Sequence, residues 1–275
     1  MNNKLYVVGT PIGNLSDLSP RAVDTLSKVD FIAAEDTRVT LKLLNHFDIK
    51  KPMVSYYEHN KRERGEIICA RILSGEDCAI VTDAGMPCIS DPGEDLIKLC
   101  EEKGIPTVVI PGPSAVISAL AVSGLETGRF CFEGFLSVNK KSRKDHLEAL
   151  RDERRTMIFY EAPHKLPSTL RDLYDFFGER KLTIVREITK IHEETIRTNT
   201  KYAAEVLAES GIKGEIVLVL EGKKSDESVE YTLEQAVETA QKLIDKGEKI
   251  NNAAKQAAQL TGIKKNEIYR ELISR

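Results

Sequence analysis

The chain has 275 residues, of which 41% are hydrophobic and 30% charged, and its net charge at pH 7 is −3. No apolar run approaches the roughly 20 residues of a membrane-spanning helix, so we expect no membrane association. The length predicts two domains of roughly 100–150 residues each. The small negative charge argues against wholesale electrostatic binding to nucleic acid but leaves room for a local basic face. The five cysteines include no C-x-x-C pair, so we expect reduced thiols, no metal site and a cytoplasmic protein.

Short apolar runs alternate with helical patterns from the first residue. The predicted strands are 5–8, 31–34, 53–56, 78–81 and 107–110, and the helices between them include 20–29, 62–73 and 94–103. Strands that alternate with helices form a mostly parallel sheet covered on both faces. Residues 1–115 are therefore expected to be an N-terminal α/β domain.

Residues 116–222 are expected to be a second α/β domain of a different kind. Its predicted strands are 130–135, 156–160, 182–187, 194–197 and 216–220, and its helices are 114–122, 141–153, 165–177 and 201–208. The gap between 187 and 194 is too short for a crossover helix, so these two strands should pair as an antiparallel hairpin. The second sheet is therefore predicted to be mixed.

The charged segment GKKSDESVE, residues 222–230, is typical of a linker, and the tail at 230–275 is helical in pattern. Two short helices joined by a Gly-containing turn at 261–262 fit a helix-turn-helix, although other helical hairpins share this pattern. From Lys242 onward there are eight Lys or Arg against four Asp or Glu, which favours contact with nucleic acid. Nucleic-acid binding by the tail stays open at this point.

Polar, turn-rich sequence follows each predicted strand of the first domain at the same end. The five loops are GTPIGN, EDTR, YEHN, TDAGMPCISDPG and PGPS. Each could be an ordinary connection; Asp36 and Arg38, for example, could form a surface ion pair. In a parallel sheet, however, all these loops meet at one edge, where ligands bind. Neither G-x-G-x-x-G nor G-x-x-x-x-G-K-[ST] is present, which argues against a ligand held by its pyrophosphate.

Six segments, in order, resemble the tetrapyrrole methylase superfamily, and within it the branch that methylates small-subunit ribosomal RNA. They are GTPIGNLSDLSPRAVDTL, AAEDTR, DAGMPCISDPG, PGPSA, FEGFL and FYEAPHK, and the resemblance covers about residues 4–222. It implies two α/β domains with S-adenosylmethionine held in the cleft between them, commonly in a homodimer. It also implies methylation of a cytidine ribose 2′-hydroxyl in the decoding region of that RNA. The tail is similar to an extra helix-turn-helix domain of the same branch.

The resemblance also implies cofactor contacts at matching motif positions. These are Pro11, Asp83, Gly85, Met86, Pro87, Ser114, Ala115, Ala162 and Pro163. Because a ribose hydroxyl is a weak acid, a positioned base can assist its reaction, although alignment alone can also suffice. The candidate bases are Glu58 and His59, followed by Asp36.

RNA binding needs cations, and the chain offers Arg38 and one basic run as candidates. The run contains Lys140, Lys141, Arg143 and Lys144. A run of this kind can also be a solvated helix start. The RNA partner is expected to be either naked small-subunit ribosomal RNA or the assembled subunit.

Two other functions stay open at the level of sequence. The same fold hosts C-methyltransferases that act on tetrapyrroles, and a fold alone does not decide the substrate. The basic run and the helical tail favour RNA, because a small acidic macrocycle requires neither. A nucleic-acid-binding regulator with a small-molecule sensor domain is the third reading. It explains less well why five polar loops gather at one edge.

Overall fold

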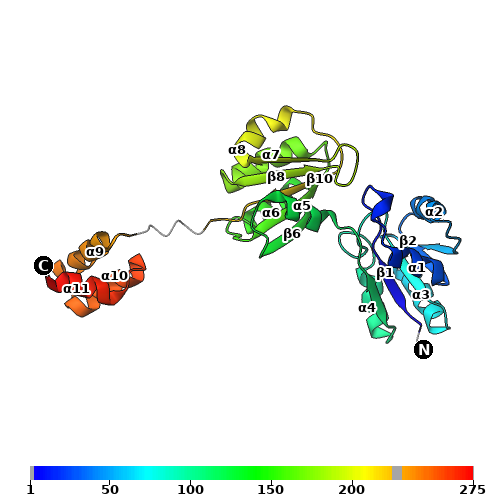
Figure 1. The fold of residues 1–275 in the computed structure, drawn as a ribbon, viewed down its shortest axis with the longest axis horizontal. Helices are drawn as coiled ribbons and strands as arrows, with labels where there is room; N and C mark the ends of the chain where they lie inside the picture. Colours follow the sequence, from blue (N-terminus) through cyan, green and yellow to red (C-terminus); the bar gives the residue numbers. More distant parts are fainter. Residues whose placement is uncertain (1–2, 225–230, 275) are drawn as a thin grey trace. The chain divides into compact units, whose positions relative to one another are not determined.

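The computed structural model describes residues 3–224 and 231–274. They form two compact units, residues 1–222 and 223–275, and each unit is described by itself. The first unit contains two five-stranded sheets, and the second contains helices (Figure 1). Of the predicted linker at 222–230, positions 225–230 lie outside the described residues.

The first sheet is entirely parallel, with the strand order β3-β2-β4-β1-β5. Its strands are β1 (Leu5–Val8), β2 (Phe31–Ala34), β3 (Met53–Ser55), β4 (Cys78–Val81) and β5 (Thr107–Ile110). Its helices are α1 (Pro20–Lys28), α2 (Thr37–His46), α3 (Lys61–Leu73) and α4 (Glu94–Glu102), with a short 3-10 turn at Leu15–Asp17. The predicted parallel sheet is confirmed, and α2 is additional to the helices expected from the sequence.

Side chains along β2 alternate between two apolar clusters, because successive residues of a strand point to opposite faces. Phe31 and Ala33 pack with residues of α3 and α4, whereas Ile32 and Ala34 pack with residues of α1 and α2. All four β2 residues are buried. Helices therefore cover both faces of the sheet, and the loops at its carboxyl edge are left open.

The second sheet is mixed, with the order β6-β7-β10-β8-β9. Its strands are β6 (Phe130–Phe135), β7 (Thr156–Glu161), β8 (Lys181–Arg186), β9 (Glu194–Asn199) and β10 (Ile216–Leu220). Its helices are α5 (Ala115–Ser123), α6 (Lys140–Ala149), α7 (Leu166–Phe177) and α8 (Thr200–Glu205), with a 3-10 turn at Leu207–Glu209. β6 and β7 are parallel, and β8 and β9 form the predicted antiparallel pair.

Two apolar layers hold the second sheet between its helices. Met157 and Phe159 of β7 pack with residues of α6 and α7, whereas Ile158 packs with Val116 and Leu120 of α5. The end of β6 and the turn between β7 and α7 follow neighbouring parallel strands, so they lie at the same edge of the second sheet. Both segments contribute to the site described below.

The second unit consists of α9 (Leu233–Asp245), α10 (Ile250–Thr261) and α11 (Lys265–Ser274). Thr232 and Gln235 form a reciprocal capping box at the start of α9. Gly262 ends α10 in the left-handed conformation, at φ 73°, which places the Thr-Gly break where the sequence predicts it. The helical tail is confirmed. Every described helix of the chain is too short or too polar to cross a lipid bilayer.

Candidate functional site

The loops after β1, β4 and β5 meet through their backbones at the carboxyl edge of the first sheet. The amide of Thr10 donates to the carbonyl of Gly85 at 2.9 Å, and the amide of Gly85 donates back at 3.2 Å. A Cβ built on Gly112 would lie only 2.7 Å from the Cα of Gly9. Two backbones can approach this closely only where neither residue has a side chain. We call this three-loop arrangement the platform.

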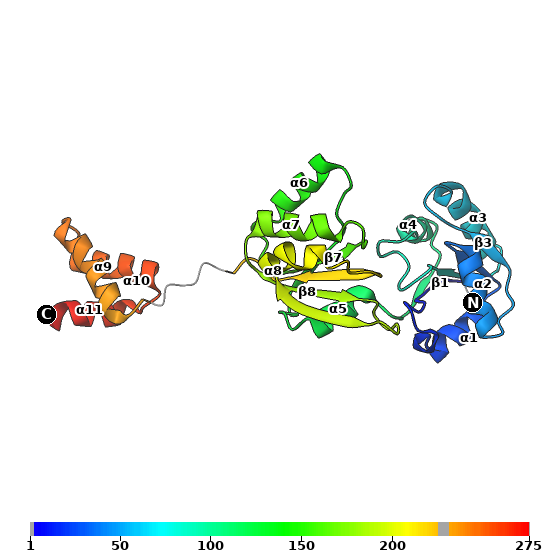
Figure 2. The same cartoon turned by 90° about the horizontal axis from the view of Figure 1, so that it is seen from above.

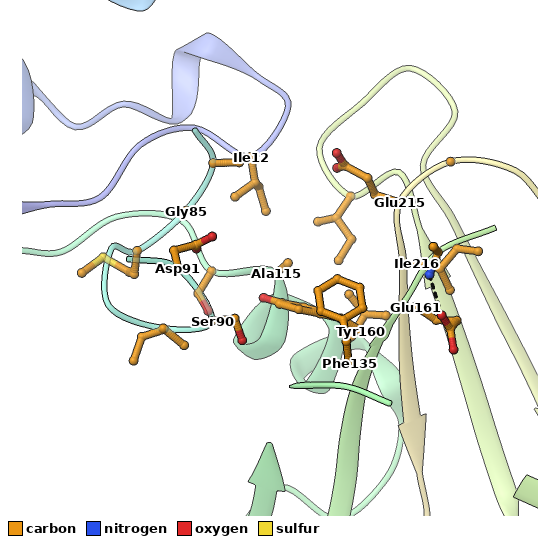
Figure 3. Close-up of a pocket in the computed structure, with 18 of the residues that line it drawn as sticks. Ile12, Gly85, Ser90, Asp91, Ala115, Phe135, Tyr160, Glu161, Glu215 and Ile216 are labelled. Carbon is orange, nitrogen blue, oxygen red and sulfur yellow. Dashed lines mark hydrogen bonds between the residues drawn. The ribbon is translucent and has the colours of Figure 1, made fainter. Parts of the chain in front are cut away.

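A cavity of about 400 Å³ lies between the platform and the second sheet. Figure 3 shows Ile12, Gly85 and Asp91 on one side of it and Phe135, Tyr160 and Glu215 on the other. From residues 1–115 it is lined by Ile12, Ala84, Gly85, Met86, Ile89, Ser90, Asp91, Ser114 and Ala115. From the second sheet and its loops it is lined by Phe135, Tyr160, Glu161, Ala162, Pro163, Ile188, Gly214, Glu215, Ile216 and Val217. We call it the edge cavity.

The structure brings most of the predicted cofactor residues together at the edge cavity. Those that line it are Gly85, Met86, Ser114, Ala115, Ala162 and Pro163. The other three, Pro11, Asp83 and Pro87, are chain neighbours of the lining residues Ile12, Ala84 and Met86 but are not among those that line the cavity. Sequence reasoning missed Asp91, Tyr160 and Glu161, although all three stand inside the motifs quoted for the resemblance.

The loop between β4 and α4 turns sharply to reach the edge cavity. Gly85, Cys88, Ser90 and Gly93 all have positive φ angles, of 87°, 71°, 64° and 142°. For a residue other than glycine this conformation costs about 1–3 kcal/mol, and such strain is concentrated at ligand sites. The strained turns bring Ser90 and Asp91 into the cavity wall.

Carboxylates gather behind this loop. The hydroxyl of Thr82 donates to Glu35 at 2.5 Å, and the amide of Asp36 donates to Asp83 at 3.2 Å. Burial, reinforced by the nearby Glu35 carboxylate, raises the pKa of Asp91 to about 6. Burial and Glu35 also raise the pKa of Asp83. Asp91 therefore combines a raised pKa with a place in the cavity wall.

The three predicted bases, Glu58, His59 and Asp36, are not among the described residues that line the edge cavity. Glu58 is paired with Lys61 at 2.7 Å, and its side chain is 66% exposed. The ring of His59 lies edge-on to Tyr57, with centroids 6.4 Å apart.

Asp36 has a structural partner for its carboxylate. It caps α2 by accepting the Arg38 amide at 2.8 Å, and it pairs with the Arg38 guanidinium at 2.6 Å. Hydrogen bonds from Arg38 lower the pKa of Asp36 to about 2, which makes this carboxylate a weak base. The helix cap and the ion pair give Asp36 a structural role, and the same pairing occupies Arg38.

The predicted RNA-binding run occupies the first turns of α6. Arg143 is largely buried, because its guanidinium donates to Asp172 at 2.5 Å and to the Thr169 hydroxyl at 2.8 Å. Lys140 and Lys144 line a second cavity, whereas Lys141 is not among its lining residues. The run thus divides into one structural arginine, two lysines that line the cavity and one lysine, Lys141, that does not.

A buried hydrogen-bond chain connects the edge cavity to Arg143. Glu161 is 4% exposed, and its carboxylate accepts from the amide of Ala162 at 2.8 Å and from the hydroxyl of Thr169. Thr169 in turn accepts from Arg143. Buried carboxylates need such donors, because an unsatisfied one is costly.

Thr169→Val is expected to lower the free energy of unfolding by about 2 kcal/mol, because it removes a donor to Glu161 and an acceptor for Arg143 without changing the side-chain volume much. Urea unfolding of the full chain measures the change. Thr25→Val is the control. The hydroxyls of Thr169 and Thr25 both donate to the carbonyl four residues earlier, Lys165 and Arg21 respectively, but the Thr25 bond is exposed to solvent. Equal losses in the two variants would mean that the chain through Glu161 contributes nothing beyond the helix.

The sequence of this chain is similar to those of known methylases. Residues 4–204 match the profile of the tetrapyrrole (corrin/porphyrin) methylases. Over 266 residues the chain is 46% identical to ribosomal RNA small subunit methyltransferase I of Synechocystis sp., covering 96% of this chain and 95% of that protein. The chain belongs to the ribosomal RNA small subunit methyltransferase I family of the tetrapyrrole methylases.

One member of the ribosomal RNA small subunit methyltransferase I family is shorter. The Thermotoga maritima protein of that name is 47% identical over 221 residues, which cover 80% of this chain but 99% of the relative. The aligned length nearly equals that of the first unit, residues 1–222. The family therefore includes proteins with little room for a counterpart of α9–α11.

A solved structure shares the fold of this family. The chain superimposes on uroporphyrin-III C-methyl transferase from Thermus thermophilus, complexed with S-adenyl homocysteine, with a TM-score of 0.56 and 16% identity. The match covers 80% of this chain and 97% of that chain. The likeness supports the tetrapyrrole methylase fold of the first unit.

Proposed function

We propose that this chain transfers a methyl group from S-adenosylmethionine to the ribose 2′-oxygen of a cytidine in the decoding region of small-subunit ribosomal RNA. Two kinds of relative support the proposal: close ones whose names state ribosomal RNA methylation, and a distant fold relative that binds S-adenyl homocysteine. The main structural argument for the proposal is the acidic and apolar lining of the edge cavity, which suits a cationic cofactor.

The residues of the edge cavity fit S-adenosylmethionine. Its described lining includes the acidic residues Asp91, Glu161 and Glu215 and no Lys, Arg or His. The Glu161 carboxylate is bonded to Thr169, and Glu215 pairs with Lys190 at 3.0 Å, so Asp91 is the main acidic group of the wall. S-adenosylmethionine carries positive charge on its sulfonium and ammonium groups, so negative side chains attract it. Apolar residues such as Ile12 and Val217 would hold its adenosine part, while the platform offers backbone groups. A pyrophosphate ligand would instead meet like charge here.

When bound, this cofactor would supply an activated methyl group that needs only an aligned acceptor. The platform fixes Gly85 against Thr10, and this holds the cavity wall in place. Enclosure between the platform and the second sheet limits access of water, which favours an aligned transfer. We assign Asp91, in place of Glu58, His59 and Asp36, as the group whose carboxylate oxygen accepts the proton of the ribose hydroxyl.

The proposal extends to the partners and the location of the protein. The substrate would be small-subunit ribosomal RNA or the assembled subunit, and the enzyme would act in the cytoplasm as a homodimer. Val109 on the edge strand β5 and Ile117 on α5 are 54% and 52% exposed, which would suit burial against a second copy.

The decisive experiment supplies the purified chain with methyl-labelled S-adenosylmethionine and small subunits that lack the modification. Label should enter one ribose 2′-oxygen, where it makes the adjoining RNA linkage resistant to alkali. A tetrapyrrole precursor serves as the competing substrate, and label in that macrocycle alone would contradict the proposal. Tight cofactor binding without transfer to either substrate would favour a regulator instead.

A further inference from the structure

A second cavity, of about 470 Å³, lies between α6 and α7. The two helices pack side by side on the same face of the second sheet (Figure 2). Four cations line the cavity, Lys140, Arg143, Lys144 and Lys165, against the single carboxylate of Asp172. The balance of charge is therefore the reverse of that in the edge cavity.

The lone carboxylate of this α6–α7 cavity is already occupied. Asp172 pairs with Arg143 at 2.5 Å, so Arg143 belongs to the cavity wall. Within the described ranges 3–224 and 231–274, the ammonium groups of Lys140, Lys144 and Lys165 form no ion pair. Three unpaired ammonium groups around one cavity can each donate charge-assisted hydrogen bonds to an anion.

The position of two of these lysines on α6 strengthens this argument. Lys140 and Lys144 lie four residues apart, and like charges at this spacing repel on a helix. The first turn of α6 contains no acidic residue, although the positive end of the helix dipole favours acids there. A bound anion would reduce the repulsion between the two lysines and would interact favourably with the positive end of the helix dipole.

The α6–α7 cavity adjoins the edge cavity along two chain segments. Phe135 lines the edge cavity, and Ser137 and Val138 just after it line the α6–α7 cavity. In the same way Pro163 lines the first and Lys165 the second. Two or three residues span at most about 7–11 Å, so a single RNA segment of a few nucleotides could reach both cavities.

We propose that the α6–α7 cavity binds a phosphodiester of the single-stranded RNA segment that presents its ribose to the edge cavity. Lys140, Lys144 and Lys165 would contact the phosphate, and the apolar side chains of Val138 and Phe176 would pack against the neighbouring base. The cavity volume falls within the range of about 300–1,000 Å³ that is usual for ligand sites. This inference rests on the proposed function, whose target is a splayed nucleotide.

The test compares Lys144→Ala and Lys165→Ala with Lys141→Ala in the full chain. Lys141 is the matched comparator, because it lies on the same helix with the same charge but outside the cavity lining. The probe is a single-stranded RNA oligonucleotide of the decoding-region sequence, whose affinity is measured between 50 and 200 mM salt. Methyl transfer to small subunits and binding of S-adenosylmethionine are measured in parallel.

Each cavity variant should weaken RNA binding about fivefold and reduce the slope of log affinity against log salt by about 0.7–1. The KM for RNA should rise while the turnover number and cofactor affinity stay the same, and Lys141→Ala should lose at most about twofold. Equal losses in all three variants would overturn the inference, because they would indicate long-range attraction rather than a site.

Two further outcomes separate this inference from the proposed function. If the wild-type chain methylates RNA and neither cavity variant loses affinity, the inference fails while the function stands. If no RNA is methylated but the oligonucleotide still binds more weakly to the cavity variants than to Lys141→Ala, the function fails while the anion site stands. Loss on assembled subunits without loss on naked RNA would identify an acidic ribosomal protein as the occupant and overturn the inference.

Discussion

Asp91→Asn is expected to lower the turnover number at saturating cofactor by about 10²–10⁴-fold, the usual contribution of a positioned general base. Burial and the nearby Glu35 hold the pKa of Asp91 at about 6, so its carboxylate is charged and able to accept a proton above that pH. The wild-type turnover number should therefore rise with pH up to about 6 and then level off. In Asp91→Asn this acid limb should be absent.

Stability distinguishes this role from a structural one. Because the pKa of Asp91 is raised above its ordinary value of 3.8, folding favours the protonated form. The stability that this group contributes is full below about pH 4 and is lost as the pH rises through about 6. Asp91→Asn should therefore unfold at an equal or higher urea concentration than the wild type at pH 8, although it is nearly inactive.

Asp36→Asn makes the matched comparison. Arg38 lowers the pKa of Asp36 to about 2, so this carboxylate contributes stability above pH 4 that is lost as the pH falls through 2. Its replacement should destabilise the chain at neutral pH and leave the acid limb of the rate profile in place. If Asp36→Asn removes the limb and Asp91→Asn does not, the base is the one first predicted from the sequence. If Asp91→Asn raises only the KM for the cofactor, Asp91 binds cofactor and takes no proton.

Regular periodicity made most of the fold predictable. The predicted strands 130–135 and 216–220 coincide with β6 and β10, because turn residues bound their apolar runs. Helix α2 was not predicted, since it begins directly at Thr37 within the polar loop EDTR and carries the β-branched pair Val39 and Thr40, which lowers helix propensity. The Asp36 cap, which depends on the local backbone, starts the helix there.

The site residues could be predicted from the sequence where a motif directly follows a strand. They could not be predicted where strained backbone angles set the direction of a side chain. Ser114 and Ala115 follow β5 directly, so the topology alone brings them to the sheet edge. The direction of Asp91 depends on positive φ angles at Cys88 and Ser90. Neither cysteine nor serine favours positive φ, so the sequence does not predict this conformation. Gly214 and Glu215, and the first residues of β10, Ile216 and Val217, reach the cavity only through pairing in the second sheet, which the local sequence does not indicate.

Gly112→Ala is expected to lower the turnover number by about 10²-fold, because it separates the loops of the platform. The φ angle of Gly112 lies outside the left-handed region, so its backbone conformation admits alanine. Space does not, since the new Cβ would lie 2.7 Å from the Cα of Gly9 and 2.8 Å from its carbonyl carbon. Both atoms belong to backbone, which moves only if a whole loop moves.

A displaced loop would shift Ser114 and Ala115 relative to Ile12 and Gly85, which line the same side of the edge cavity. The free energy of unfolding should fall by about 1–3 kcal/mol, the usual cost of forcing extra volume into a packed site. Gly128→Ala is the control, because nothing lies within 4 Å of its Cβ position, and it should change neither quantity measurably. Calorimetric titration with S-adenosylmethionine should show weaker binding to Gly112→Ala alone. A variant that is less stable but binds cofactor and turns over like the wild type would mean that the contact between Gly9 and Gly112 holds the fold and not the cofactor.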